Sequence, residues 1–289
     1  MRFAVVAHRR SETNERLAAA ASKLGLSGSV LGPRDALCAL GPGDIALARL
    51  DILESLDGVE DGTTELDRLA AAGVTLLNPP AALASAHDKL LTARALRRAE
   101  LPHPHTSLIA AGVPSAAPDL PVVLKPRFGS WGRDIVLCRT GAELDGELRR
   151  LEARPWFREH GVLAQELVEP VGWDLRIVVA AGRVVGAARR VAALGEWRTN
   201  VALGARVEPA PAPALARTLA IRAAAAVRAD LVGVDLLPTR NGYVVVEVNG
   251  AVDFRPAYAL DLDDVFEEAV FQLVRSVFDR PAAPLVQVG

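Results

Sequence analysis

The chain has 289 residues, of which 51% are hydrophobic and 24% are charged, and its formal net charge is −2. This composition provides ample apolar cores for one large domain or for two to three lobes, and it excludes a disordered or fibrous chain. The near-neutral balance of charge argues against a basic protein that binds nucleic acid.

Neither the cysteines nor the apolar stretches indicate export or a membrane role. Cys38 and Cys138 are too few for a disulfide framework, and we expect both to be buried thiols in a reducing cytoplasm. Residues 1–7 are too short an apolar run for a signal peptide and are typical of a first strand. Residues 69–86 lack charge, but a glycine and two prolines interrupt them, which predicts a helix end, a strand and a turn rather than a membrane span.

Strand and helix signals alternate in the first part of the chain. Strands are predicted at residues 3–7, 44–48 and 74–77, and helices at 14–24 and 65–72. This alternation predicts a small parallel sheet, and we assign residues 1–85 to an N-terminal α/β domain. No GxGxxG sequence follows the first strand, so no dinucleotide site is expected there.

The rest of the chain begins with a predicted helix at residues 88–99, for which Asp88 is the expected N-terminal cap. Strands are then predicted in two groups, at 122–125, 135–137 and 162–166, and at 175–180, 184–189, 232–237 and 244–248. Helices are predicted at 141–151, about 213–229 and about 263–279. Tight turns within the second group of strands predict an antiparallel sheet.

Three oxygen-bearing side chains stand out on the last two predicted strands. Glu247 and Asn249 lie two residues apart and therefore on one face of a strand. A loop of odd length centred on Asn241 would place Asp235 opposite Glu247 on that face. Since an unpaired buried carboxylate is costly, these groups need a cation, and hard oxygen donors suit Mg²⁺ shared with substrate phosphates. The alternative is a set of strand-end groups bonded to backbone or to arginines.

Lysine is rare in this chain. Of the 33 lysines and arginines only Lys23, Lys89 and Lys125 are lysines, so each is a candidate for chemistry that needs a compact ammonium group. Lys125 ends an apolar strand, and a loop with two glycines and a hydroxyl group follows at residues 129–133. Such a loop could fold over phosphates, although it lacks the Walker spacing and a β-turn without a ligand is the alternative.

Further polar residues follow the next strands. The segment at 165–167 could offer backbone groups to adenine and a carboxylate to a ribose, and Asp174 and Arg176 alternate on one strand face. Arg198, Thr199 and Asn200 add a cation, a hydroxyl and an amide. Arginines that face a carboxylate cluster suit an anionic ligand bridged by a metal ion, although each arginine alone is more often a surface or structural cation.

In this order the motifs resemble the ATP-grasp superfamily from about residue 78 onward, and within it the RimK-type ligases, including their LysX-like branch. The resemblance implies α/β and α+β lobes: an N-terminal parallel lobe before the ATP-grasp domain, then that domain at residues 86–289 with a lid lobe at about 106–167 and an antiparallel lobe at about 168–289. ATP would lie between the last two lobes. The matching segments are Asp88-Lys89, Val123-Leu124-Lys125-Pro126, Gly129-Ser130-Trp131-Gly132-Arg133, Gln165-Glu166, Gly172-Trp173-Asp174-Leu175-Arg176, Trp197-Arg198-Thr199-Asn200, Gly233-Val234-Asp235-Leu236 and Glu247-Val248-Asn249.

By matched position, the resemblance implies a role for each of these residues. Arg198, Lys125 and Arg176 would be catalytic, and Asp235, Glu247 and Asn249 would hold Mg²⁺ or Mn²⁺. The nucleotide-binding residues would be Lys89, Lys125, Gly129, Ser130, Trp131, Gly132, Gln165, Glu166, Leu167, Asp174, Arg198, Thr199 and Asn200.

The resemblance implies an ATP-dependent carboxylate–amine ligase that forms an amide through an acylphosphate and releases ADP and phosphate. An amino acid would be joined to a carrier protein, a peptide or a small acid. The second candidate is a ligase of the glutathione-synthetase or D-Ala–D-Ala type that makes a free dipeptide, and a candidate of another class is a non-catalytic ATP-binding module. We expect a cytoplasmic protein of amino-acid metabolism without nucleic-acid or membrane partners. The sequence leaves open whether the protein forms a homo-oligomer.

Overall fold

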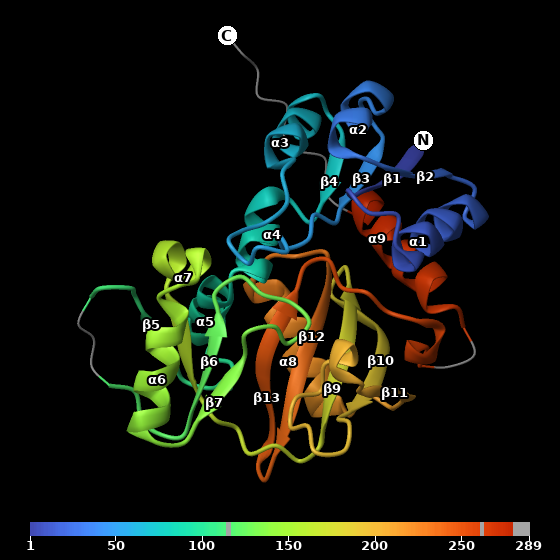
Figure 1. The fold of residues 1–289 in the computed structure, drawn as a ribbon. Helices are drawn as coiled ribbons and strands as arrows, with labels where there is room; N and C mark the ends of the chain where they lie inside the picture. The colour runs from blue at the N-terminus through green and yellow to red at the C-terminus, as the bar shows by residue number, and fades with distance from the viewer. Residues whose placement is uncertain (114–116, 261–262, 280–289) are drawn as a thin grey trace.

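The computed structural model describes residues 1–113, 117–260 and 263–279 and contains three sheets with their helices (Figure 1). The predicted combination of a parallel α/β lobe, a lid lobe and an antiparallel lobe is confirmed. The sheets span residues 2–77, 106–166 and 173–249, whereas the division into domains after residue 85 stays a prediction. In the described part of the chain, no helix is long and apolar enough to cross a bilayer.

The N-terminal sheet is parallel, with the order β2-β1-β3-β4. Its strands are β1 (Arg2–Val6), β2 (Ser27–Leu31), β3 (Ile45–Ala48) and β4 (Thr75–Leu77), and its helices are α1 (Glu12–Lys23), α2 (Pro33–Ala39) and α3 (Thr63–Ala71). The sequence does not predict β2 or α2, because β2 has no clear alternation and α2 is too short for a periodic signal. In β2, a Cβ on Gly28 would lie 1.9 Å from the carbonyl oxygen of Ala18, so glycine lets α1 pack against this strand.

The lid lobe has an antiparallel sheet of order β5-β8-β6-β7. Its strands are β5 (Thr106–Ile109), β6 (Val122–Pro126), β7 (Val136–Cys138) and β8 (Val162–Glu166), and its helices are α6 (Gly141–Leu151) and α7 (Pro155–His160). A capping box between Thr140 and Glu143 starts α6 at the predicted residue. Cys138 is buried in the core of this lobe, but Cys38 is exposed, so the expectation of two buried thiols is wrong for Cys38, which lies on the short, largely exposed α2.

The third sheet is antiparallel, with the order β11-β10-β9-β12-β13. Its strands are β9 (Trp173–Ala180), β10 (Arg183–Val191), β11 (Arg206–Pro209), β12 (Leu231–Thr239) and β13 (Gly242–Asn249). Helix α8 (Ala214–Ala226) covers one face and α9 (Val265–Asp279) the other, as alternate residues of β9 show: Ile177 belongs to the cluster with α8 and Val178 to the cluster with α9. Helices α4 (Pro80–His87) and α5 (Lys89–Arg98) connect the first sheet to the lid.

The β12–β13 hairpin reaches the predicted pairing by a different route. Thr239 pairs with Gly242, so the loop has two residues rather than an odd number, and the loop prediction is wrong. The register shifts further along, where Leu236 pairs with Val245 but Asp235 pairs with Glu247. The extra residue on β13 is a β-bulge, which compensates for the even loop and places Asp235 opposite Glu247 as predicted.

The N-terminal lobe contacts the rest of the protein on more than one side. Helix α9 packs against α1 (Figure 1), and one apolar cluster runs from β1 through α9 to the third sheet. On the other side, Leu56 has a positive φ of 65° and lies buried in the apolar core of the lid lobe. Next to it, the carbonyl oxygen of Asp57 lies 2.7 Å from Nε2 of His160 on α7. The lid therefore has its own core but receives one side chain from the N-terminal lobe.

Candidate functional site

Six polar side chains lie on one face of the third sheet. The strand register pairs Arg190 with Asp174, Arg176 with Asp235, and Asp235 with Glu247. Paired residues of an antiparallel sheet share a face, as do residues two apart on a strand, which adds Asn249. The strands thus place each of two arginines beside an aspartate, and one of these aspartates beside Glu247.

Asp235 is bonded by two guanidinium groups. Arg176 Nε and Nη2 lie 2.7 Å from its two oxygens, and Arg190 Nη2 lies 2.8 Å from Oδ2. Arg190 also bonds both oxygens of Asp174, which accepts a hydrogen bond from Thr199 at 2.6 Å. Asp174, Arg190 and Asp235 are each at most 6% exposed. In such a dry environment charge-assisted hydrogen bonds are strong and an unpaired charge is costly.

The arginines decide the charge of this cluster. Burial raises the pKa of Asp235, but the charges of Arg176 and Arg190 outweigh it and hold the pKa of this carboxyl well below its usual range. In Asp174 the burial effect outweighs Arg190, and the pKa is raised. Burial also opposes the charge of Arg190, yet Asp235 and Asp174 raise the pKa of that guanidinium. Asp235 is therefore an anion near neutral pH.

Two of the three lysines, Lys89 and Lys125, face this sheet, whereas Lys23 is exposed and pairs with Glu267. Asp88 caps α5, as predicted, by accepting hydrogen bonds from the first-turn amides, and Lys89 is the first residue of that helix. The Nζ of Lys89 lies 2.9 Å from Oε1 of Glu247 and also donates to the Gly129 carbonyl. Lys125 Nζ donates to Gln165 Oε1 at 2.8 Å, and burial lowers the pKa of this ammonium group to about 8. Two ammonium groups thus lie at the carboxylate cluster, and that of Lys125 has a lowered pKa.

The glycine-bearing loop of the lid is held against the segment after β10. Trp131 and Gly132 have positive φ values of 59° and 73°. A Cβ on Gly132 would lie 2.8 Å from Oδ1 of Asn200, so glycine permits this close approach. Arg198 Nη1 donates to the carbonyl oxygens of Gly132 and Ile135 at 3.1 and 3.2 Å. The lid loop and the segment at 198–200 therefore form one wall.

Two adjoining cavities lie between this wall and the polar face of the third sheet, with volumes of about 430 and 120 Å³. They share Ile135, Arg190, Asn200 and Glu247. The larger is lined by the predicted residues Lys89, Gly129, Ser130, Trp131, Gly132, Arg176, Asn200, Glu247 and Asn249. The smaller is lined by the predicted residues Lys125, Gln165, Glu166, Leu167, Asp174, Arg198, Thr199, Asn200, Asp235 and Glu247. The structure brings all of these residues together, while their individual roles stay predictions.

The oxygen donors predicted to hold Mg²⁺ are neutralised by protein cations in this structure. Arg176 and Arg190 bond Asp235, and Lys89 bonds Glu247. With its amide oriented to satisfy both ends, Asn249 donates to Glu247 and accepts from Arg176, each at 3.2 Å. Hard oxygen atoms beside a polar cavity fit Mg²⁺, which would displace these cations in part. Among the described residues no cluster of three or more His, Cys, Asp or Glu side chains could hold a metal, so the Mg²⁺ assignment stays a prediction.

Several residues that line the site do not follow from the sequence motifs. Arg190 bonds two of the predicted acids, and its position opposite Asp174 appears only once β9 and β10 are paired. Ser11 and Asp51, from the N-terminal lobe, and His87 at the end of α4 line the larger cavity. No local pattern links them to the third sheet, because they approach it only through tertiary packing.

Comparison with known proteins identifies the fold and the family. The chain resembles the solved RimK-domain ATP-grasp protein of Sphaerobacter thermophilus at a TM-score of 0.63 and 21% identity, over 95% of this chain and all of that one. The three lobes thus form an ATP-grasp fold. The model of the RimK-like ATP-grasp domain matches residues 86–262, and the chain belongs to this family.

Curated relatives include ligases with different partners. The chain is 31% identical over 217 residues to tetrahydromethanopterin:α-L-glutamate ligase of Methanosarcina acetivorans, a match that covers 68% of this chain. It is also 31% identical over 195 residues to glutamate–LysW ligase ArgX of Sulfurisphaera tokodaii, covering 65% of this chain and 68% of that enzyme. The match spans slightly less than two thirds, 65%, of the methanogen enzyme's length.

Proposed function

We propose that this protein is an ATP-dependent ligase that joins a carboxylate to an amine through an acylphosphate. The observation that carries the proposal is the meeting of Lys89 and Lys125 with Asp235 and Glu247 at two adjoining cavities. Ammonium groups that face carboxylates across a cavity suit a triphosphate with its divalent ion. The names of the relatives, which are ligases for glutamate, support the same chemistry.

The smaller cavity would receive the nucleotide. Gln165, Glu166 and Leu167 at the end of β8 would lie along the base and the ribose, and Lys125 and Arg198 would lie along the phosphates. The larger cavity would receive the γ-phosphate and the two substrates, beneath the lid loop at residues 129–132. Mg²⁺ would arrive with ATP and be held by Asp235, Glu247 and Asn249, where it would neutralise charge on the phosphate oxygens. Mn²⁺ is the alternative ion.

The reaction has two steps. An oxygen of the substrate carboxylate forms a bond to the γ-phosphorus, the bond from that phosphorus to the bridging oxygen breaks, and ADP leaves. The amine then attacks the acyl carbon, phosphate leaves with the former carboxylate oxygen, and the amine gives up a proton. Lys89, Lys125 and Arg198 would stabilise the charge that develops on the phosphoryl oxygens, with Arg176 beside them. The lid loop would exclude water, which would otherwise hydrolyse the acylphosphate.

The relatives suggest the first substrates to examine. The names of both relatives contain glutamate, and they give tetrahydromethanopterin and LysW as the second partners. We therefore propose an amino acid as the amine and a carrier protein, a peptide or a small acid as the carboxylate. As an ATP-consuming enzyme it would act in the cytoplasm.

The decisive experiment measures phosphate release and product mass with MgATP, L-glutamate and a panel of small acids, peptides and carrier proteins. The proposal predicts release of ADP and phosphate only when acid and amine are both present, together with a product whose mass shows one new amide bond. A product made from two free amino acids would indicate a dipeptide ligase instead. Thermal stabilisation by ATP without phosphate release from any pair would contradict the proposal and favour a non-catalytic ATP-binding module.

A further inference from the structure

A third cavity, of about 280 Å³, lies between the N-terminal lobe and the segment after β13. It adjoins the larger cavity of the candidate site, because Ser11, Asp51, Ala251 and Asp253 line both. Away from this junction it is lined by three arginines, so we call it the arginine cavity. The residues that line only the arginine cavity include Arg9, Arg10, Asn14, Arg49 and Glu60.

Arg49 is a buried cation with incomplete bonding. It follows β3 directly and is only 3% exposed. Its Nε donates to Asn14 at 2.6 Å, and its Nη2 donates to the Val252 carbonyl at 2.8 Å and lies 3.3 Å from Asp253. Its Nη1 is buried and has no partner among the described residues. The one carboxylate that contacts this guanidinium, Asp253, is itself 67% exposed, and nearby Asp51 is paired with Arg9, so the buried charge is poorly compensated.

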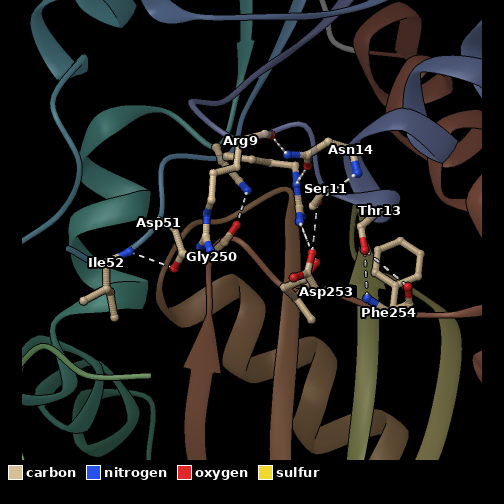
Figure 2. A network of polar contacts seen from close by, with 12 residues as sticks. Arg9, Ser11, Thr13, Asn14, Asp51, Ile52, Gly250, Asp253 and Phe254 are labelled. Atoms are coloured by element: carbon tan, nitrogen blue, oxygen red, sulfur yellow. Dashed lines mark hydrogen bonds and ion pairs between the residues drawn. The ribbon is translucent and has the colours of Figure 1, made fainter. Parts of the chain in front are cut away.

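The other two arginines lie at the rim with partners that can exchange. Arg9 and Arg10 follow β1, and their side chains are 55% and 70% exposed. Arg9 forms an ion pair with Asp51 at 2.7 Å, and Arg10 forms one with Glu15. Exposed pairs of this kind contribute little stability, so an incoming carboxylate can replace them. Figure 2 shows Arg9 turned toward Asp51 at this rim.

The junction with the larger cavity is the more acidic part of this cavity. The carboxylates of Asp51 and Asp253 lie there, in contact with Arg9 at 2.7 Å and Arg49 at 3.3 Å, whereas the arginines and Glu60 line only the part beyond it. Figure 2 shows Ser11 directed at Asp253 at the start of α1. A ligand with an amine at the junction and a carboxylate at the arginines matches this order.

We infer that the arginine cavity binds the free α-carboxylate of an amino acid, whose amine lies at Asp51 and Asp253 and faces the larger cavity. The inference rests on the proposed function in that this amino acid would be the amine substrate of the ligase. Arg9, Arg10 and Arg49 would then fix the orientation of the nucleophile without touching ATP.

The test measures binding directly, so it does not depend on turnover. The proteinogenic L-amino acids are screened by thermal shift with a non-hydrolysable ATP analogue present and absent. Each binder is then titrated by calorimetry beside its decarboxylated and its deaminated analogue, which for L-glutamate are γ-aminobutyrate and glutarate. We expect both analogues to bind about tenfold more weakly or worse, because each lacks one charge-assisted contact.

The variants locate the site. In Arg9→Gln/Arg10→Gln, the affinity for the amino acid should fall about tenfold, while that for the decarboxylated analogue stays the same. Arg49→Gln should have a similar effect if circular dichroism shows that it folds, and the rim variant decides if it does not. Arg34→Gln, an exposed arginine on α2 outside the cavity, is the matched control.

Three results would overturn the inference: no amino acid binds, the rim variant binds as tightly as the unaltered protein, or either analogue binds as well as its parent. Phosphate release is measured separately on the same samples. Absent phosphate release with intact amino-acid binding would count against the ligase alone, and phosphate release with unaltered binding by the arginine variants would count against this inference alone.

Discussion

Lys89 of α5 forms a 2.9 Å ion pair with Glu247 of β13, which joins the connection between the lobes to the centre of the candidate site. The same ammonium group donates to the carbonyl oxygen of Gly129 in the lid loop. One side chain of α5 therefore contacts both the third sheet and the lid. Its carboxylate partner, Glu247, is the residue on which the proposed chemistry depends most.

Replacing that partner tests the proposed chemistry. Glu247→Gln keeps the shape of the side chain but removes an anion from Lys89 and a ligand from the proposed ion. We expect phosphate release with MgATP to fall about a hundredfold or more. Glu208→Gln, a half-exposed acid on β11, is the control and should retain full activity. Undiminished phosphate release by Glu247→Gln would contradict the assignment.

The buried ammonium group of Lys125 predicts a pH dependence of stability. Its pKa is about 8 in the folded protein, against 10.5 for an ordinary lysine. Between these values the unfolded chain binds more protons than the folded one, so the free energy of unfolding should rise with pH, by up to about 3 kcal/mol from this group. Below pH 8 Lys125 is protonated in both states, so the whole cost of burying its charge lowers the free energy of unfolding.

Urea unfolding of the protein and of Lys125→Met between pH 7 and pH 10.5 measures this difference. The variant cannot titrate at this position, so its stability should exceed that of the parent most at the low end of the range, and the two curves should converge at the high end. Parallel curves would show that Lys125 keeps an ordinary affinity for its proton.

Arg190 should be a major source of stability for the third sheet. Removing its guanidinium group in Arg190→Met leaves the buried carboxylates of Asp174 and Asp235 with fewer partners, which should lower the free energy of unfolding by about 3–5 kcal/mol. The neighbouring Arg189 is exposed and stacks on Trp173, with 4.7 Å between its Cζ and the ring centroid. Arg189→Met should therefore lower it by less than about 1 kcal/mol. Equal losses in chemical denaturation would argue against the network.

Gly132 should matter for ligand binding more than for folding. Gly132→Ala would place a Cβ 2.8 Å from Asn200 and 2.9 Å from Leu203, and it would move the lid loop away from its wall. Gly182→Ala is the matched control, because that residue has the same φ of 73° but no atom within 4 Å of the added Cβ. Both should lose about 1 kcal/mol of stability through backbone strain. Only Gly132→Ala should weaken MgATP binding in calorimetry, and equal affinities would refute a role for the loop.

The sequence predicts the parts of this protein that local patterns determine. The amphipathic helix α6 and the apolar strand β8 appear at their predicted residues. The facing of Asp235 and Glu247 also follows from the sequence, although the two-residue loop and the bulge that produce it do not, because both depend on the twist of the assembled hairpin. Short elements such as α2 carry too few residues for a periodic signal.

The candidate site divides in the same way. Residues of the ATP-grasp motifs can be found from the chain alone, since each lies in a recognisable strand or loop. Arg49 and Asp51 cannot, because they reach the site only when the N-terminal sheet packs against the segment after β13. The incomplete bonding of Arg49 is a property of that tertiary contact, and no sequence pattern reports it.

Leu56 gives the N-terminal lobe a part in any opening of the lid. Its side chain lies in the lid core, so swinging the lid away would pull the leucine into water at a cost of about 1.5–3 kcal/mol or drag its segment along. That segment is the excursion between Asp51 and Glu60, whose two ends are tied together by a hydrogen bond from the Asp51 amide to the Glu60 carboxylate at 2.8 Å. Opening of the lid would therefore shift Asp51 and Glu60, which line the arginine cavity. A ligand bound in that cavity would in turn change the free energy of lid opening.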